Sequence, residues 1–278
     1  MKQLFDTTSY DCSRLVTKSY STSFSMGIKL FSPKIRAAIY AIYGFVRYAD
    51  EIVDTFHDYE QETLFNEFEQ DYYKAIERKI SLNPILNAFQ EIVHAYDLQE
   101  YVQDFMDRMR MDLDKKEYTS KEEYENYIYG SADVVGLMCL RVFVNNDETK
   151  FNELKGYAMR LGSAFQKVNF LRDIRQDNEE LGRSYFPNLE DGALTEQTKA
   201  EIIADIDNDF SEAYKGIVLL PMEGKLGVYL AYRYYQRLLK KIKRTDCEKI
   251  MNGRIRISNS LKLVLLTKAV VRYRLNFI

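Results

Sequence analysis

Two pairs of aspartates are the residues of this chain most suited to chemistry. Asp50 and Asp54 stand four residues apart, and so do Asp173 and Asp177. In a helix this spacing puts both carboxylates of a pair on one face, a turn apart. Like charges at this spacing weaken a helix, so a chain that repeats the arrangement is expected to gain something from the charge. The simplest gain is a hard divalent cation, which takes oxygen ligands and leaves room for phosphate oxygens.

Each pair continues a row of polar residues along one helix face. We call these rows the first stripe and the second stripe. The first stripe consists of Tyr43, Arg47, Asp50 and Asp54, and the second of Gln166, Asn169, Asp173 and Asp177. A single Asp-x-x-x-Asp match is usually a solvated helix face, but two matches with polar neighbours favour a site. Two stripes facing each other across a cavity would hold more than one Mg²⁺.

The chemistry that fits such stripes is the ionisation of a diphosphate. Metal ions and nearby arginines (Arg47, Arg172, Arg175) would stabilise the charge on the leaving diphosphate. The carbocation left behind needs a dry pocket, and aromatic faces can stabilise it without reacting. The chain has 22 Tyr and 16 Phe. Ordinary core packing accounts for most of them.

The rest of the sequence predicts helices throughout. Pro33 after Ser32 opens an apolar stripe that runs to Val53. No alternating segment demands a sheet, and no linker or repeat divides the chain. We therefore expect one all-α domain over residues 1–278, a helical bundle around a central hydrophobic channel. Further helices are expected near 8–20, 60–79, 84–95, 98–113, 121–144, 149–178, 195–216, 222–243 and 260–274.

From the composition and the lack of a targeting segment we expect a cytoplasmic protein. Its three cysteines match no disulfide framework or zinc pattern. The N-terminus lacks an apolar signal core, and the apolar stretch Leu261 to Val271 is too short and too charged to span a bilayer.

Charge is unevenly distributed along the chain. From Lys225 onward, 14 Lys and Arg oppose two acidic residues, which gives +12, whereas the remainder carries −15 and the whole chain −3. Most of these basic residues are expected on a solvated face. A phosphate-binding wall or attraction to anionic lipid is the sharper interpretation. Peripheral membrane contact is expected at Leu261 to Arg274. Binding of nucleic acid is not expected, because no recognised motif accompanies the charge.

Four segments of the sequence resemble the squalene/phytoene synthase family of head-to-head prenyltransferases, bacterial phytoene synthases above all. The segments are Ser19-Tyr-Ser-Thr-Ser-Phe24, Tyr40 to Asp54, Gln166 to Asp177, and Gly182-Arg-Ser-Tyr-Phe-Pro187. The resemblance covers nearly the whole length. Each aspartate signature alone is weak, but the two in this order are highly specific.

The resemblance implies roles for residues one by one. Asp50, Asp54, Asp173 and Asp177, with Asn169, would hold Mg²⁺, for which Mn²⁺ is a possible substitute. Prenyl diphosphate would be bound by Ser21, Ser23, Arg47, Tyr129, Gln166, Asn169, Arg172, Tyr235 and Arg254. Tyr43 and Tyr129 would lie near the reacting carbons. For Tyr235 a core position is the competing interpretation.

Two residues depart from the family pattern. Asp133 and Arg108 stand where the family commonly has glycine. Asp133 is expected to pair with a basic residue, to join the polar site, or to lie harmlessly on the surface. Neither residue belongs to the aspartate pairs, so the departures concern substrate preference rather than activity.

The resemblance implies condensation of two geranylgeranyl diphosphates through a cyclopropyl diphosphate to phytoene, a step of carotenoid biosynthesis, without NADPH. The same chemistry on farnesyl diphosphate, giving dehydrosqualene or hydroxysqualene, is the nearest alternative. A head-to-tail elongase usually doubles the aspartates, but positions 51 and 174 are Glu and Ile. A silent lipid-binding relative and a nucleic-acid or lipid-surface binder that uses residues 225–278 are alternatives of another class.

Overall fold

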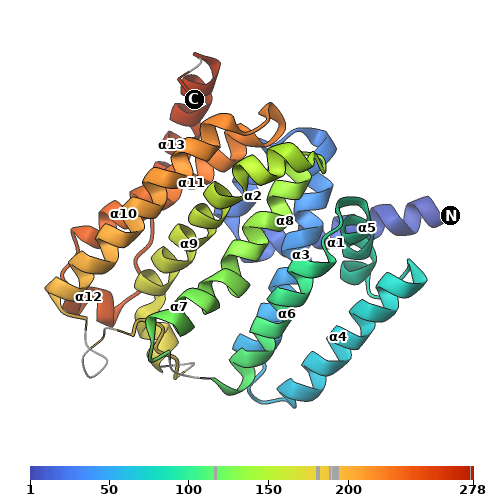
Figure 1. Cartoon of the computed structure of the whole chain (residues 1–278), viewed down its shortest axis with the longest axis horizontal. Coiled ribbons are helices and arrows are strands. Elements are labelled where there is room, and N and C mark those ends of the chain that lie inside the picture. Colours follow the sequence, from blue (N-terminus) through green and yellow to red (C-terminus); the bar gives the residue numbers. More distant parts are fainter. Residues whose placement is uncertain (116–117, 180–181, 188, 190–193, 276) are drawn as a thin grey trace. The chain divides into compact units, whose positions relative to one another are not determined.

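The structure is a computed structural model that describes residues 1–115, 118–179, 182–187, 189, 194–275 and 277–278. These residues form helices and contain no β-strand (Figure 1). The chain divides into two compact units. Unit 1 comprises residues 1–114, 137–153 and 221–227, and unit 2 comprises residues 115–136, 154–220 and 228–278.

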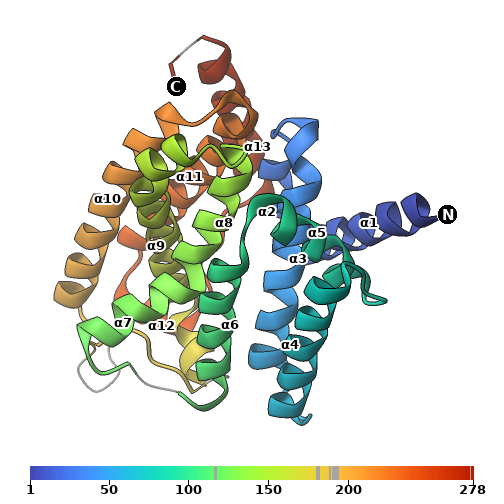
Figure 2. The ribbon, with the colours of Figure 1, turned by 45° about the vertical axis from the view of Figure 1, so that its right-hand side comes forward.

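Unit 1 is organised around helix α3. Its aromatic core stacks Phe45 of α3 on Phe89 of α5 (ring centroids 4.0 Å apart) and on Phe68 of α4 (5.5 Å), and Phe45 is fully buried. Such contacts combine a large buried area with a preferred ring geometry, so they fix the orientation of α3. The helices that lie mainly in unit 1 are α1 (Lys2–Tyr20), α2 (Thr22–Ile28), α3 (Pro33–Thr55), α4 (Gln61–Arg78), α5 (Pro84–Tyr96) and α6 (Gln99–Asp114). Helices α3 to α6 can be followed side by side in Figures 1 and 2.

Unit 2 is organised around helix α9. Phe210 of α10 is buried between Phe165 of α9 and Tyr232 of α11. Gly216 lets α10 approach α9 closely, because a Cβ there would lie 2.3 Å from that of Tyr157. The remaining elements are α7 (Lys121–Ile128), a π-helical turn η1 (Tyr129–Asp133), α8 (Val134–Phe143), α9 (Glu148–Glu179), α10 (Glu196–Leu219), α11 (Met222–Lys243), α12 (Cys247–Asn252) and α13 (Asn259–Arg274). Of these, α8, α9 and α11 contribute residues to both units.

The helices expected from periodicity are confirmed, with four differences. Helix α1 begins at Lys2, six residues before the expected start at residue 8. The helical run 121–144 is interrupted by the π turn η1, whose five residues are too few to show a period of their own. Two short helices, α2 and α12, were not expected, because six or seven residues are too few to show a period. The single domain over 1–278 stays a prediction.

No helix in the described part of the chain combines the length and the apolarity that a membrane span requires.

Candidate active site

The first stripe lies along α3. All four of its side chains (Tyr43, Arg47, Asp50 and Asp54) are half-buried. The opposite face of α3 carries apolar residues such as Ala41 and Phe45, each 0% exposed. The burial of that face holds the helix in one orientation, so the polar residues stay together at its margin.

Asp50 lies in an unusually acidic environment. Burial, followed by the charge of Asp54, raises the pKa of Asp50 to about 8, although Arg47 opposes the shift. Asp112 of α6 and Glu51 raise it further. Asp112 is itself buried, 5% exposed. A bound cation would offset this repulsion and favour the ionised carboxylates.

Arg47 is held by charge and by an aromatic ring. Its guanidinium forms an ion pair with Glu51 and lies 4.4 Å from the ring centroid of Tyr20. Burial alone would lower the pKa of Arg47, but Asp50 and Glu51 outweigh burial and raise it. The Nε atom of Arg47 is buried and has no hydrogen-bond partner among the described residues. An acceptor from a bound molecule would satisfy it.

Tyr43 of α3 and the two serines at the start of α2, Ser21 and Ser23, also belong to unit 1. The ring of Tyr43 stacks on Phe24 of α2, with centroids 5.0 Å apart. The hydroxyl of Ser21 accepts a hydrogen bond from the backbone N–H of Phe24 at 3.2 Å, so Ser21 caps α2. Ser23 follows in the first turn of α2 and is half-buried. The cap therefore fixes the helix that presents Phe24 to Tyr43.

The second stripe lies on α9, and its central carboxylate is clasped by two arginines. Arg172 donates to both oxygens of Asp173, from Nε at 2.9 and 3.0 Å. Arg254, 81 residues further along the chain, reaches Asp173 Oδ1 from its Nε at 2.9 Å. Burial alone would lower the pKa of Arg172, but the hydrogen bond to Asp173 leaves it raised. Arg254 keeps 42% of its side chain exposed, and a guanidinium has five donors, so donors remain for another anion.

A tyrosine from α11 completes this stripe. The hydroxyl of Tyr235 donates to Asn169 Oδ1 at 3.2 Å. The amide of Asn169 in turn donates to Gln166 Oε1 at 3.4 Å. The ring of Tyr235 stacks on Phe165 at 4.1 Å. Tyr235 is thus both a packed core residue and a polar contact of the stripe, so the two interpretations of this residue are compatible.

The segment 182–187 follows α9 and packs beneath it. The backbone N–H of Arg183 donates to the carbonyl of Asp177 at 2.8 Å. Tyr185 stacks on Phe170 of α9 at 4.1 Å, with the rings 13° apart. Asp177 is half-buried.

Arg175 was expected to help bind phosphate. Its side chain is instead exposed, and it bonds Glu179 and the carbonyl of Asn252.

Tyr129 is the first residue of the π turn η1, and Asp133 is the last. Asp133 is 6% exposed and accepts hydrogen bonds from Ser163 at 2.8 and 3.1 Å. A surface position for Asp133 is therefore wrong. Gly162 lies against the same turn, since a Cβ there would come within 2.9 Å of Ala132 O and Asp133 Oδ1. These contacts lock η1 to α9.

Sequence reasoning missed a buried ion network on the other side of α9. Asp209 is completely buried and pairs with Lys167 at 2.6 Å and Arg160 at 2.9 Å. Lys167 also pairs with Asp205. The partners lie 38 to 49 residues apart in sequence, so no local pattern reveals them.

Asp112 was also missed, although a signal for it exists. It continues the buried stripe of α6 formed by Val102, Phe105, Met106 and Met109. A carboxylate in an apolar register is a recognisable anomaly.

Arg108 on the same helix has a buried Nε without a partner among the described residues and contacts the sulfur of Met111 at 3.2 Å, and nothing in the structure explains why arginine stands there.

Both stripes offer the donor types that Mg²⁺ prefers. The first supplies carboxylate oxygens, and the second supplies Asp173 and the amide oxygen of Asn169, which suit a hard cation. In the described residues, no three carboxylate, thiol or imidazole groups are near enough to one another to form a metal site.

Comparisons with known proteins show the family to which the chain belongs. The sequence model for squalene/phytoene synthase matches residues 17–260. The chain is 30% identical to the phytoene synthase of Arthrospira platensis, over 96% of this chain and 94% of that protein. It is 29% identical to the 15-cis-phytoene synthase of Synechocystis, over 95% and 85%.

Among solved structures, a dehydrosqualene synthase superposes with a TM-score of 0.82, covering 97% of this chain and 98% of the other at 19% identity. The fold expected from the sequence, an all-α isoprenoid synthase, is confirmed. The chain belongs to the squalene/phytoene synthase family, and it is accordingly a prenyltransferase of the head-to-head type that acts on prenyl diphosphates.

Proposed function

We propose that this chain condenses two molecules of geranylgeranyl diphosphate to phytoene in a reaction that requires Mg²⁺ and no NADPH. The choice of the C20 substrate is supported by the relatives named phytoene synthase, which the chain matches over most of its length. The observation that carries the assignment of the site is the second stripe. Arg254 and Tyr235, distant in sequence, both bond to it.

The first stripe supports the metal requirement. Asp50 and Asp54 stand one turn apart with Asp112 close enough to act on Asp50, and Mg²⁺ bound there would offset the repulsion between these carboxylates. When bound with the substrate, Mg²⁺ would supply positive charge to the departing diphosphate. Arg47, whose Nε has no partner among the described residues, would donate to the same oxygens.

The second stripe supports diphosphate binding. Asp173 and Asn169 would supply metal ligands. The remaining donors of Arg172 and Arg254 would bind diphosphate oxygens. Asp54 and Asp177 would complete the metal ligands, and Gln166, Ser21 and Ser23 would add neutral contacts. Because Tyr235 donates to Asn169 Oδ1, it would hold the amide of Asn169 in the orientation in which its oxygen can bind Mg²⁺.

Two ionisations make up the proposed reaction. In the first, one C–O bond breaks, diphosphate leaves, and the double bond of the second prenyl chain attacks the cation; loss of a proton closes a cyclopropane. In the second, the cyclopropyl diphosphate ionises, rearranges and loses another proton to give phytoene. Tyr43, stacked on Phe24, and Tyr129 would present aromatic faces to these cations.

A product assay tests the proposal. We expect purified protein with Mg²⁺ and geranylgeranyl diphosphate to give phytoene, EDTA to abolish the product, and omission of NADPH to change nothing. If farnesyl diphosphate gave a C30 product with a higher kcat/KM, the proposed C20 substrate would be wrong and the C15 substrate would take its place. The proposed role of Mg²⁺ would not be affected.

The metal assignment is tested by Asp50→Asn. We expect a loss of at least about 100-fold in kcat, because the substitution removes a ligand whose charge assists ionisation. The control is Asp58→Asn, which removes an equal charge from an exposed residue beyond the end of α3 and should retain activity. Equal activity in both variants, with unchanged Mg²⁺ dependence, would refute the role of Asp50.

A further inference from the structure

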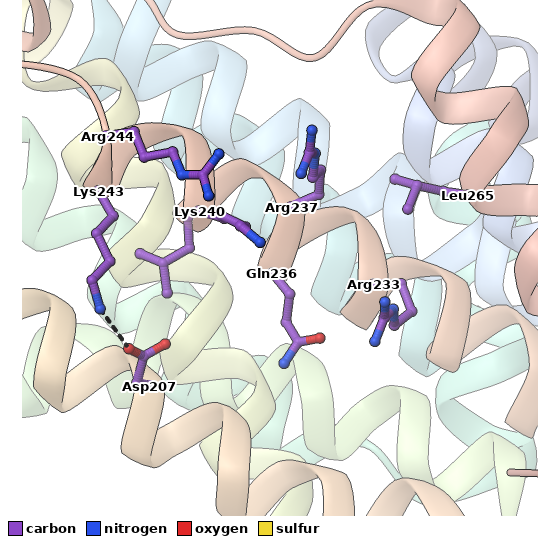
Figure 3. Close-up of a pocket in the computed structure, with 9 residues that line it drawn as sticks. Asp207, Arg233, Gln236, Arg237, Lys240, Lys243, Arg244 and Leu265 are labelled. Carbon is purple, nitrogen blue, oxygen red and sulfur yellow. Dashed lines mark ion pairs between the residues drawn. The ribbon is translucent and has the colours of Figure 1, made fainter.

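A basic pocket lies in unit 2, formed by helices α10, α11 and α13 (Figure 3). Its volume is about 600 Å³. Five cationic side chains line it and a single carboxylate, Asp207, opposes them. None of these residues has a place in the proposed condensation. The lining consists of Asp207, Arg233, Gln236, Arg237, Leu239, Lys240, Lys243, Arg244 and Leu265.

Four of the cations, three on α11 and one just beyond its end, form one row, as Figure 3 shows. The row, which we call the cation row, consists of Arg233, Arg237, Lys240 and Arg244. Their spacings of four, three and four residues place them on one face of the helix. No member of the row forms an ion pair with another described residue, whereas Lys243 reaches Asp207 at 3.8 Å.

The helix itself does not require this arrangement. Like charges three or four residues apart repel and weaken a helix. Positive charge in the last turn offsets that cost through the helix dipole, which accounts for Lys240 and Lys243. Arg233 and Arg237 lie earlier in the helix, where this effect has faded. An anion in the pocket would reverse the repulsion between them.

Apolar residues accompany the cations. Leu239 and Leu265 line the pocket and are buried, 3% and 8% exposed. On the outward side of α13, Val264 and Val271 are 46% and 49% exposed, and Leu275 just beyond its end is 59% exposed. Spacings of seven and four residues put these three on one face of the helix. Helix α13 therefore contributes Leu265 to the basic pocket and carries an exposed apolar stripe on an adjacent face, about 100° around the helix from Leu265.

We propose that this pocket binds the phosphate headgroup of an anionic phospholipid and docks unit 2 on acidic membrane surfaces. The cation row would contact the headgroup phosphate, and the stripe Val264, Val271 and Leu275 would enter the boundary with the acyl chains. A soluble phosphate would satisfy the cations but would leave the apolar stripe in water. The combination of both features favours a lipid.

Flotation with vesicles tests the proposal on the full chain. We expect the protein to float with vesicles of phosphatidylcholine and phosphatidylglycerol in equal amounts, to remain unbound with phosphatidylcholine alone, and to be released by high salt. Each Lys or Arg near an anionic surface contributes about fivefold to binding. The variant R237Q/K240Q should therefore bind the acidic vesicles about 30-fold more weakly.

The matched control is R78Q/K155Q, which removes one Arg and one Lys from exposed positions on α4 and α9 and should bind as the wild type does. Because all four positions lie on the surface or the pocket rim, the variants should fold, which circular dichroism checks. Equally weak vesicle binding by both variants would show that only the overall positive charge of the protein matters, and it would refute the role of the pocket. Failure of the wild type to float would overturn membrane docking.

A second variant separates lipid from soluble phosphate. V271S/L275S should weaken vesicle binding while leaving the calorimetric affinity for inorganic phosphate unchanged, measured in EDTA so that metal-dependent binding of phosphate at the two stripes does not contribute. If R237Q/K240Q loses a phosphate-binding event that the wild type and an R172Q variant both keep, while V271S/L275S floats like the wild type, the pocket serves a soluble phosphate compound and the lipid assignment is wrong.

Discussion

At the scale of single residues, Tyr235 shows how one side chain serves packing and polarity together. Its ring stacks on Phe165 and its hydroxyl bonds Asn169. Tyr235→Phe removes only the hydroxyl. Since a hydrogen bond of this kind contributes about 1 kcal/mol, we expect kcat/KM to fall about fivefold while the melting temperature changes little. Steady-state kinetics measure the loss. Tyr234→Phe, which removes a hydroxyl from the adjacent residue of α11, should leave kcat/KM unchanged, and an equal fall in both variants would contradict the role of the Asn169 contact.

Asp133 is a residue whose burial makes stability depend on pH. Burial raises its pKa from 3.8 to about 7, against the hydrogen bond from Ser163; Asp209 adds to the shift, and Lys167 opposes it. Arg160 and Asp205 complete the nearby charges. Because the folded state holds the proton more tightly than the unfolded state, the contribution of Asp133 is most favourable below about pH 4 and is lost as pH rises to about 7.

Asp133→Asn removes this titration. Relative to the wild type, the variant should gain stability between about pH 5 and pH 8, by up to about 3 kcal/mol. Urea unfolding at several pH values measures the difference. The exposed Glu122→Gln on α7 is the control and should follow the wild type at every pH. Wild-type and Asp133→Asn curves that stay parallel would show that Asp133 does not titrate in this range.

At the scale of elements, the contact between α9 and the π turn η1 depends on a glycine. Gly162→Ala would place a Cβ 2.9 Å from the carbonyl oxygen of Ala132, a backbone atom that cannot swing away. We expect a destabilisation of about 1–3 kcal/mol in urea unfolding. Gly156 on the same helix has nothing within 4 Å of a built Cβ, so Gly156→Ala should stabilise by about 0.5–1 kcal/mol. Shifts of the same sign in both variants would show that η1 does not constrain Gly162.

The helices that carry the stripes could be predicted because their apolar and polar residues follow one period for several turns. The start of α3 at Pro33 is an example. The π turn η1 could not be predicted, since Tyr129 to Asp133 contain no residue that demands the extra backbone unit. The clasp on Asp173 required tertiary information, because Arg254 approaches from a segment between α12 and α13. Family resemblance supplied that residue, whereas spacing alone did not.

At the scale of the whole molecule, the structure shows where the basic residues of the segment 225–278 lie. Most of the basic residues are exposed, as a solvated face requires. Several of these basic residues have particular partners or positions. Arg254 binds Asp173, Lys243 and Lys249 pair with Asp207 and Asp246, Lys241 donates to the carbonyl of Arg256, and the cation row lines a pocket. Net charge alone would not distinguish these from their neighbours. Position on the helix and the presence or absence of a partner do.

Tyr235 and three members of the cation row (Arg233, Arg237 and Lys240) belong to one continuous helix, α11. Tyr235 bonds the second stripe of α9, while Arg233 and Arg237, two residues to either side, line the basic pocket. A single amino acid inserted into α11 between Arg233 and Tyr235 would be felt on both sides at once, since each added residue turns a helix by about 100°. Evolution can therefore exchange side chains on either surface of α11 one at a time, but it cannot lengthen or shorten the helix there without disturbing both.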